Sequence, residues 1–217
     1  IAVAMVGKRK CYKVHVVVPE NVSQEVKQML LLYGAETICS EGSKGTNGSI
    51  ELAKKLVEDS RYYMPYQYGN QNNPLAHYET TGAEILNELP RVDGFVAGLG
   101  TGGTLMGVGR RLKEHNPETK VIAVVPQTAD RIHGLRSLEE GFVPPILDLT
   151  LLDGRFVVDS KESFRATKEL TTREGIFAGV SSGAVIHCAR RIAERMREGN
   201  IVCLLADGGW KYLSTGL

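Results

Sequence analysis

Short apolar runs alternate with helix-patterned stretches along the chain, and this alternation constrains the fold more than any other feature. Residues 13–18 (KVHVVV), 94–97, 121–125 and 201–205 are apolar runs of strand length, and helical patterns separate them. Strands joined through helices favour a parallel sheet that is covered on both faces. We therefore expect an α/β protein with three layers, α, β and α, and mostly parallel sheets.

A polar, aromatic segment at residues 61–74 (RYYMPYQYGNQNNP) is the best candidate for a crossing between domains. It predicts a smaller α/β domain at residues 1–65 and a larger α/β domain at residues 66–217. In the larger domain a helical pattern runs over residues 77–88. The irregular stretch at residues 126–147 is too long to be a mere connection, so we expect it to lie at a functional site.

Composition excludes several classes of function. Lys and Arg number 26 against 25 Asp and Glu, a formal net charge of +1, so no basic field indicates a nucleic-acid partner. The first residues are apolar over too short a length to span a membrane, and their basic residues follow the apolar run, unlike those of a signal peptide. The cysteines form no CxxC pair and no metal-ligand spacing with histidine, which indicates reduced thiols in a cytoplasmic protein. These cysteines are Cys11, Cys39, Cys188 and Cys203.

A glycine loop at residues 98–107 (GLGTGGTLMG) lies between an apolar run and a helical stretch. Glycines let the backbone approach a ligand closely, and the first N–H groups of a helix are unpaired and lie at the positive end of its dipole. The loop therefore predicts a bound phosphate.

Two motif matches suggest other enzymes, but each lacks a required part. Residues 98–103 satisfy GxGxxG, yet the next strand ends in residues 124–127 (VVPQ) without the carboxylate that holds a dinucleotide ribose. Residues 179–183 satisfy GxSxG around Ser181, but a hydrolase needs an acid and then a histidine later in the chain, and only His187 follows. Neither an NAD-dependent oxidoreductase nor a hydrolase is expected.

The phosphate loop and Ser181 each precede a helix, so both helix N-termini could converge on one ligand with a phosphate at one end and a polar ring atom at the other. Pyridoxal phosphate fits this description. The alternative is that both segments are tight turns without a ligand.

Six blocks, in order and in register, resemble the cysteine synthase family of pyridoxal-phosphate enzymes. They are PENVSQEVKQMLLLYGAE, YQYGNQNNPLAHYETTGAEI, VAGLGTGGTLMGVGRRLKE, EEGFVP, REGIFAGVSSGA and DGGWKYLSTG. The resemblance implies the two-domain fold of fold-type II pyridoxal-phosphate enzymes, similar to the tryptophan synthase β subunit, with the cofactor phosphate in the larger domain. It also implies a homodimer.

The same resemblance assigns roles to individual residues. Ser181 is implied as the partner of the pyridine nitrogen, and a neutral hydroxyl there favours prompt loss of a β-substituent over a long-lived carbanion. Gln67 is implied as a contact to the carboxylate of the amino-acid substrate. The implied phosphate cup consists of Gly100, Thr101, Gly102, Gly103 and Thr104.

The implied reaction is a β-replacement that forms L-cysteine from O-phosphoserine or O-acetylserine and a sulfur donor, either sulfide or a thiocarboxylated carrier protein. Arg136, in GLRSLEEGFVP, stands where acetylserine-using relatives more often have a neutral residue, and an arginine fork suits a phosphate. With GWKYLSTG, it makes the chain resemble an O-phosphoserine sulfhydrylase. Alternatively, Arg136 pairs with Glu139 or Glu140 at the surface.

The resemblance places the lysine that forms the Schiff base, and a Ser/Thr/Asn-rich substrate loop, ahead of Ile1. We therefore expect the fold to be incomplete at its N-terminus and the chain alone to turn over little or no substrate. Its own lysines are expected on surfaces or beside the terminal glycines: Lys8, Lys10, Lys54, Lys55 and Lys211. A cystathionine β-synthase-like or dehydratase-like lyase and a non-catalytic cofactor-binding module remain alternatives.

Overall fold

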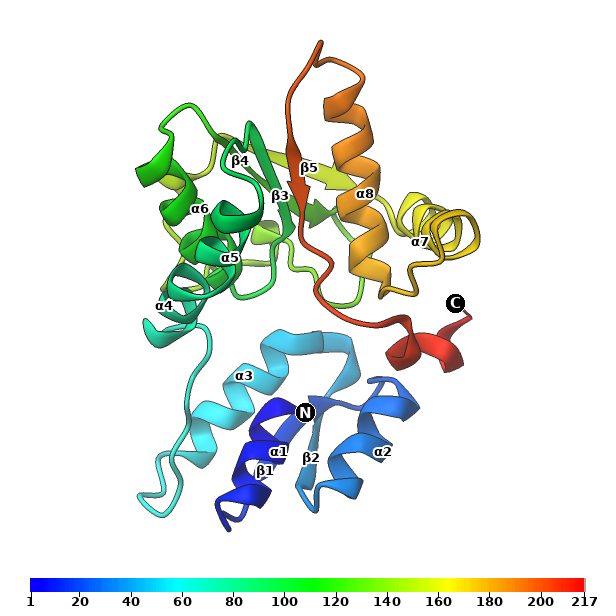
Figure 1. The fold of residues 1–217 in the computed structure, drawn as a ribbon. Coiled ribbons are helices and arrows are strands. Elements are labelled where there is room, and N and C mark those ends of the chain that lie inside the picture. The colour runs from blue at the N-terminus through cyan, green and yellow to red at the C-terminus, as the bar shows by residue number, and fades with distance from the viewer. Residues whose placement is uncertain (217) are drawn as a thin grey trace. The chain divides into compact units, whose positions relative to one another are not determined.

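A computed structural model describes residues 1–216, and the chain divides into two compact units (Figure 1). One unit comprises Ile1–Pro65 together with the residues from Trp210 onward, and the other comprises Tyr66–Gly209. The C-terminal residues therefore belong with the first unit, whereas the sequence analysis placed them in the larger domain.

The first unit contains a two-stranded parallel sheet and three α-helices. Strands β1 and β2 pair with His15 opposite Glu36, and Ala4, Val18, Leu30 and Ala35 form a small buried core. The elements are α1 (Ala2–Arg9), β1 (His15–Pro19), α2 (Gln24–Leu32), β2 (Glu36–Ser40), the 3₁₀ turn η1 (Gly42–Lys44) and α3 (Gly45–Leu56).

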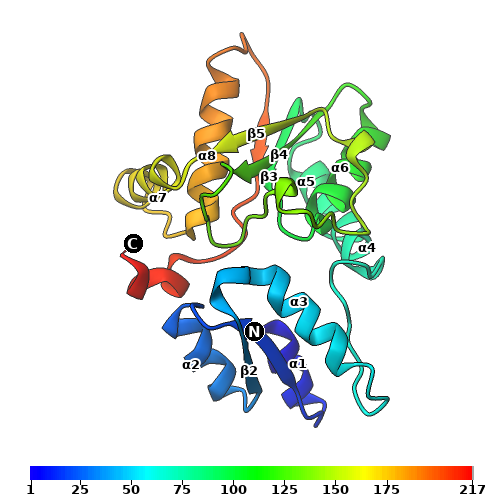
Figure 2. The ribbon, with the colours of Figure 1, turned by 180° about the vertical axis from the view of Figure 1, so that it is seen from behind.

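The second unit is built on a parallel sheet of four strands in the order β5-β4-β3-β6. Helices α4, α5 and α6 cover one face, and α7 and α8 cover the other (Figures 1 and 2). The helices and strands are α4 (Asn72–Glu79), α5 (Thr81–Glu88), β3 (Gly94–Gly98), α6 (Gly103–His115), β4 (Lys120–Pro126), β5 (Gly154–Val158), α7 (Ser160–Glu174), α8 (Val180–Ala193) and β6 (Ile201–Cys203). Its 3₁₀ turns are η2 (Leu138–Glu140) and η3 (Leu149–Leu151), and η4 (Gly209–Thr215) begins at its last residue and continues into the first unit. The expected layered α/β class is confirmed.

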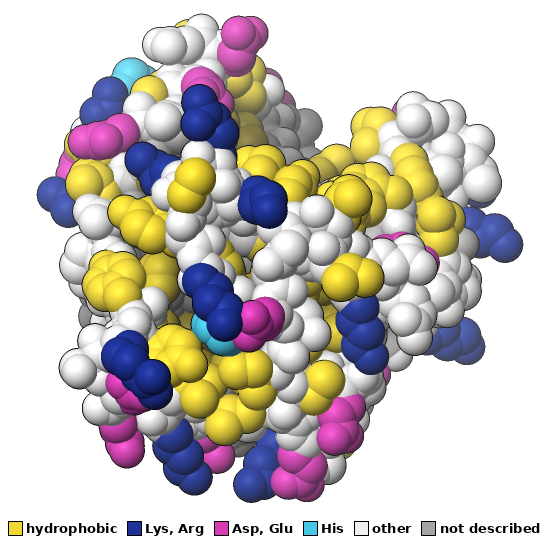
Figure 3. All heavy atoms as spheres, turned by 90° about the horizontal axis from the view of Figure 1, so that it is seen from below, with side chains coloured by type: hydrophobic (Ala, Val, Ile, Leu, Met, Phe, Trp, Pro, Cys, Tyr) yellow, Lys and Arg dark blue, Asp and Glu magenta, His cyan; other side chains and the backbone are white. Residues whose placement is uncertain are grey.

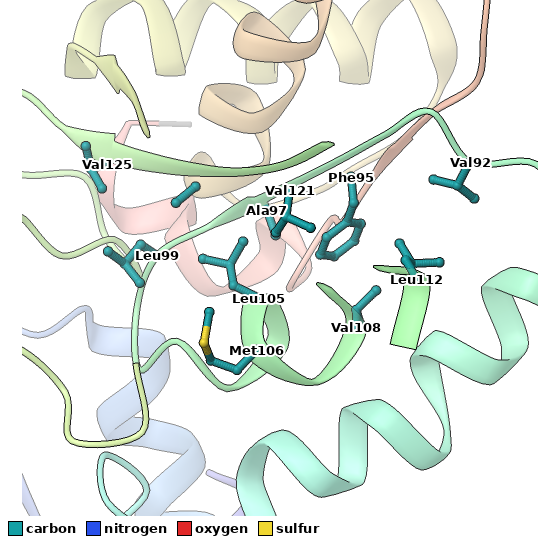
Figure 4. Close-up of a cluster of buried hydrophobic side chains, with 11 residues drawn as sticks. Val92, Phe95, Ala97, Leu99, Leu105, Met106, Val108, Leu112, Val121 and Val125 are labelled. Atoms are coloured by element: carbon teal, nitrogen blue, oxygen red, sulfur yellow. The ribbon is translucent and has the colours of Figure 1, made fainter. Parts of the chain in front are cut away.

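The main core of the second unit lies between the sheet and α6 (Figure 4). Phe95 on β3 and Val121 on β4 are fully buried against Leu105 and Val108 of α6. A Cβ at Gly109 would lie 3.0 Å from Val121 Cγ1, so the glycine lets the helix approach the sheet closely. This packing fixes the first turn of α6 at the end of β3.

The helix expected over residues 77–88 is divided in two by the structure. The break falls at Thr80, which has φ −110° and ψ −80° and donates its hydroxyl to the Ala76 carbonyl at 2.7 Å. Helix α4 also begins earlier than expected, at Asn72, with Pro74 in its first turn, where the missing N–H of proline is tolerated.

The first unit leaves large hydrophobic side chains exposed on two helices. They are Val3, Met5 and Val6 on α1 and Leu31 and Leu32 on α2. Hydrophobic side chains interspersed with lysine and arginine are also prominent on the face seen in Figure 3. Exposed apolar surface of this kind is typical of contacts with other proteins.

Candidate cofactor and substrate site

The glycine loop joins the end of β3 to the start of α6, as the sequence predicted. Gly102, the N-cap residue of α6, has φ +90°, a left-handed conformation that favours glycine, and it offers no side-chain cap of its own. Within residues 1–216 no acceptor is found for the backbone N–H groups of Gly100, Thr101, Gly102 and Thr104. Such a set of unpaired donors at the positive end of a helix dipole fits an anion.

Two of these glycines lie so close to neighbouring atoms that a side chain would crowd them. A Cβ at Gly103 would lie 2.0 Å from Asn73 Oδ1, and a Cβ at Gly100 would lie 3.0 Å from the Gly134 carbonyl oxygen. The loop is therefore held between α4 on one side and the segment around Gly134 on the other.

Both threonine side chains of the loop bond to α4. Thr101 Oγ1 accepts from Asn73 Nδ2 at 3.0 Å and from the Gly103 N–H at 3.3 Å. Thr104 Oγ1 lies 3.2 Å from Nε2 of His77, and burial lowers the pKa of His77 below its ordinary value of 6.5. The sequence analysis assigned no role to Asn73 or His77, because only the packing of α4 on α6 brings them to the loop.

Ser181 lies in the first turn of α8 and is buried, with a 6% exposed fraction. Gly134, at φ +90°, lies next to it, since a Cβ at this glycine would be 3.5 Å from Ser181 Oγ. Because the Gly134 carbonyl also lies beside Gly100, this segment lies against both the loop and Ser181. The adjacent Ser182 hydroxyl is buried and finds no hydrogen-bond partner in the described part of the chain.

The start of α8 is held by α7. Ser163 Oγ donates to the Val180 carbonyl at 2.6 Å, and a Cβ at Gly183 would lie only 2.1 Å from the Ser163 carbonyl oxygen. A side chain at Gly183 would therefore separate the two helices, and glycine at this position keeps the first turn of α8, with Ser181, in place.

Arg136 is buried, with a 6% exposed fraction, so it does not lie at the surface as one reading of the sequence predicted. Its guanidinium carbon lies 5.2 Å from the Tyr68 ring centroid and 4.8 Å from that of Phe142. Its backbone N–H donates to the Leu99 carbonyl at 2.7 Å, at the start of the glycine loop. Glu139, one of the two partners that this reading suggested, accepts the Thr128 hydroxyl.

Gln67 has an exposed side chain, but its backbone is tied to the glycine loop. Its carbonyl accepts from Asn73 Nδ2 at 2.8 Å, and the same nitrogen donates to Thr101. Gln67 is followed directly by Tyr68, which packs on Arg136. The sequence analysis missed Tyr68 and Phe142, although both lie within the blocks YQYGN and EEGFVP that drew attention to their neighbours.

Other kinds of site receive no support from the described residues. No lysine among residues 1–216 is buried. Among residues 1–216, no cluster of histidine, cysteine and carboxylate side chains is suited to a metal ion, and no helix combines the length and the apolar character of a membrane span.

Comparison with known proteins identifies the family. The family model described as "Pyridoxal-phosphate dependent enzyme" matches residues 1–207. Cysteine synthase of Aquifex aeolicus is 40% identical over 225 residues, covering 100% of this chain and 69% of that protein. Cysteine synthase of Staphylococcus aureus is 37% identical over 227 residues, covering 100% of this chain and 73% of that protein.

Solved structures agree with this assignment. A crystal structure of O-ureido-L-serine synthase matches with a TM-score of 0.91 and 35% identity, covering 99% of this chain and 71% of that one. Cysteine synthase from Entamoeba histolytica matches with a TM-score of 0.89 and 31% identity, covering 99% of this chain and 67% of that one. The fold is that of fold-type II pyridoxal-phosphate enzymes, and the relatives support cysteine synthesis or related sulfide-producing chemistry. The chain belongs to the pyridoxal-phosphate dependent enzymes and, within them, to the cysteine synthase family, whose cofactor is pyridoxal phosphate.

Proposed function

We propose that the protein forms L-cysteine from O-phosphoserine by β-replacement with a sulfur donor, and that Arg136 recognises the substrate phosphate. The observation that carries this proposal is the burial of Arg136 against the rings of Tyr68 and Phe142. A guanidinium packed against two aromatic rings has a constrained orientation, and its fork of donors suits a phosphate better than an acetyl group.

The residues of the site fit pyridoxal phosphate. In the proposal, the N–H donors of the glycine loop and the Thr101 and Thr104 hydroxyls hold the phosphate, and Ser181 faces the pyridine nitrogen. When bound, the cofactor supplies an electron sink for the α-carbon of the substrate, which lets a β-substituent leave. The neutral Ser181 hydroxyl limits how strongly the ring nitrogen is held protonated.

Substrate positioning in this proposal depends on two neighbouring segments. The exposed Gln67 side chain contacts the substrate carboxylate, while Arg136, against the adjacent Tyr68, binds the leaving phosphate. An arginine there also stabilises the negative charge that the phosphate carries as it departs.

We also propose that no lysine of residues 1–217 forms the Schiff base with the cofactor. The lysines are all at least partly exposed, and a lysine that acts as a nucleophile needs a desolvated setting that lowers its pKa. Borohydride reduction of the chain with pyridoxal phosphate, followed by peptide mapping, should find no uniquely modified lysine. One modified lysine in near-stoichiometric yield would overturn this part of the proposal.

Three further features are proposed from the family alone: a homodimer, a cytoplasmic location, and sulfide or a thiocarboxylated carrier protein as the sulfur donor. Exposed Leu31 and Leu32 are compatible with a protein contact, and sedimentation velocity measures whether one forms.

Substitution of Arg136 tests the substrate. Arg136→Met keeps an apolar stem against the two rings and removes the charge. Arg155→Met, which removes an exposed arginine from β5 of the same unit, is the matched control. With pyridoxal phosphate bound, changes in cofactor absorbance report the affinities for O-phosphoserine and O-acetylserine. Loss of charge-assisted hydrogen bonds should weaken O-phosphoserine binding about 10- to 100-fold in Arg136→Met, with little change for O-acetylserine.

An unchanged ratio of the two affinities in Arg136→Met would refute the phosphate assignment. A wild-type preference for O-acetylserine would instead make that ester the substrate. Cofactor binding without a response to either amino acid would favour a non-catalytic binding module.

A further inference from the structure

Helix α4 presents two polar side chains, one turn apart, to the glycine loop at the start of α6. Asn73 Nδ2 lies 3.0 Å from Thr101 Oγ1, and His77 Nε2 lies 3.2 Å from Thr104 Oγ1. Asn73 and His77, four residues apart on one face of α4, thus bond to the two threonines that carry the only hydroxyl groups of residues 98–107. Figures 1 and 2 both show α4 beside α6.

The orientation of the Asn73 amide is fixed by its second partner. The Gln67 carbonyl, 2.8 Å away, can only accept a hydrogen bond, so the nitrogen of the amide must face it. The same nitrogen reaches Thr101, which therefore accepts from Asn73. A side chain at Gly103 would collide with this amide, so the glycine reserves the space that Asn73 fills.

These bonds decide where the Thr101 hydroxyl proton points. The oxygen has two lone pairs, and it accepts both from Asn73 and from the Gly103 N–H. Its own proton must then be donated elsewhere, and residues 1–216 offer it no acceptor. An anion in the loop would receive it.

His77 can direct the Thr104 hydroxyl in the same way. Its Nδ1 lies 3.1 Å from the Thr81 hydroxyl, which can donate to it. With the ring proton on Nε2, His77 donates to Thr104 Oγ1, and the Thr104 proton is left for an anion.

We propose that Asn73 and His77 are positioning residues for the cofactor phosphate: they donate to Thr101 and Thr104, so that both threonine hydroxyls donate to the phosphate oxygens. This inference rests on the proposed assignment of the glycine loop as the phosphate cup. Asn73 also connects the cup to Gln67, so one amide supports both the cofactor loop and the proposed substrate segment.

The test compares two ligands that differ only in the phosphate. Dissociation constants for pyridoxal phosphate and for pyridoxal are measured by equilibrium dialysis, together with the ³¹P chemical shift of the bound cofactor and the melting temperature. His77→Gln keeps an N–H donor, His77→Leu removes it, and Asn73→Asp replaces the donor with a carboxylate of the same shape. Glu79→Gln, on the exposed side of α4, is the matched control.

The expected pattern is specific to the phosphate. His77→Leu should weaken pyridoxal phosphate binding about 10-fold and Asn73→Asp about 100-fold or more, with a shifted ³¹P resonance, because a charge-assisted bond is lost or a negative charge is added. Pyridoxal binding should stay unchanged, and His77→Gln and Glu79→Gln should resemble the wild type.

Two results would overturn the inference. Equal weakening of both ligands would show that α4 only supports the fold, and unchanged pyridoxal phosphate binding in both His77→Leu and Asn73→Asp would show that the hydroxyls need no positioning. If the wild type binds pyridoxal as tightly as pyridoxal phosphate, and inorganic phosphate does not compete, the cup assignment itself fails, and the inference fails with it.

Discussion

Replacing Gly183 by alanine tests whether the packing of α7 on α8 holds the first turn of α8. The new Cβ would lie 2.1 Å from both the Ser163 carbonyl oxygen and Thr167 Oγ1, and 2.7 Å from the Thr167 backbone nitrogen. Two of these atoms are backbone, so a rotamer change cannot relieve the overlap. The Ser163 carbonyl would have to retreat by roughly 1 Å before the contact became an ordinary one.

The cost can be worked from this geometry. Overpacking of a close-packed contact costs about 1–3 kcal/mol. Separation of the helices also stretches the bonds from Ser163 and Thr167 to the Val180 carbonyl, at 2.6 and 3.4 Å, each worth about 0.5–1.5 kcal/mol. The higher helix propensity of alanine relative to glycine offsets about 1 kcal/mol of this destabilisation. We expect a net loss of about 1–5 kcal/mol in the free energy of unfolding.

Urea unfolding of Gly183→Ala measures this loss, with Gly154→Ala as the control, because a Cβ at Gly154 meets nothing within 4 Å. The control should stay within about 0.5 kcal/mol of the wild type. Displacement of α8 should also weaken pyridoxal phosphate binding, since Ser181 lies two residues from the substitution. A Gly183→Ala variant as stable as Gly154→Ala would refute the reasoning.

Three other predictions concern thiols, pH and association. Burial raises the pKa of Cys188 to about 12, so iodoacetamide at pH 8 should alkylate exposed Cys11 and leave Cys188 unmodified in the folded protein; comparable modification by mass spectrometry would contradict this. The hydrogen bond from Arg190 lowers the pKa of Glu169 below 4.5, so the stability this pair adds is present above pH 4.5 and is lost as the pH falls through the lowered value. Arg190→Gln should therefore destabilise the protein more at pH 7 than at pH 3, as chemical unfolding at both values would show. Leu31, with a 75% exposed fraction, should favour self-association, and Leu31→Lys should lower the sedimentation coefficient at high concentration if it does.

The fold was predictable wherever the decisive pattern was local. The buried strand Gly94–Gly98, the glycines after it and the apolar face of the next helix are contiguous in sequence, and they determine the strand, loop and helix. The parallel sheet and the family were also predictable, and both are confirmed. The break at Thr80 was not, because an unbroken helical pattern continues through it and only the local bond to Ala76 marks the break.

Composition could not predict which of the two units the C-terminal residues belong to. Ser214 donates its backbone N–H and its hydroxyl to the Glu25 carboxylate at 2.8 and 2.7 Å, and these residues are 189 positions apart. Nothing in the local sequence around either residue indicates the other. A single boundary near residue 65 therefore missed the return of the chain to the first unit.

The site assignments stay predictions, and the structure shows why sequence alone reached only part of the surroundings. The glycines of the loop are recognised from spacing, whereas two close neighbours of Gly103 and Gly100, Asn73 and Gly134, come from segments that carry no phosphate-binding pattern of their own. The shape of the glycine loop thus depends on two other segments, α4 and the residues around Gly134. Under the proposed function, the segment around Gly134 also positions Arg136 for the substrate, because the Arg136 backbone N–H donates to the Leu99 carbonyl at the start of the glycine loop. Substitutions that move this segment should then change cofactor affinity and ester preference together, whereas a change confined to the Arg136 side chain should affect the ester alone.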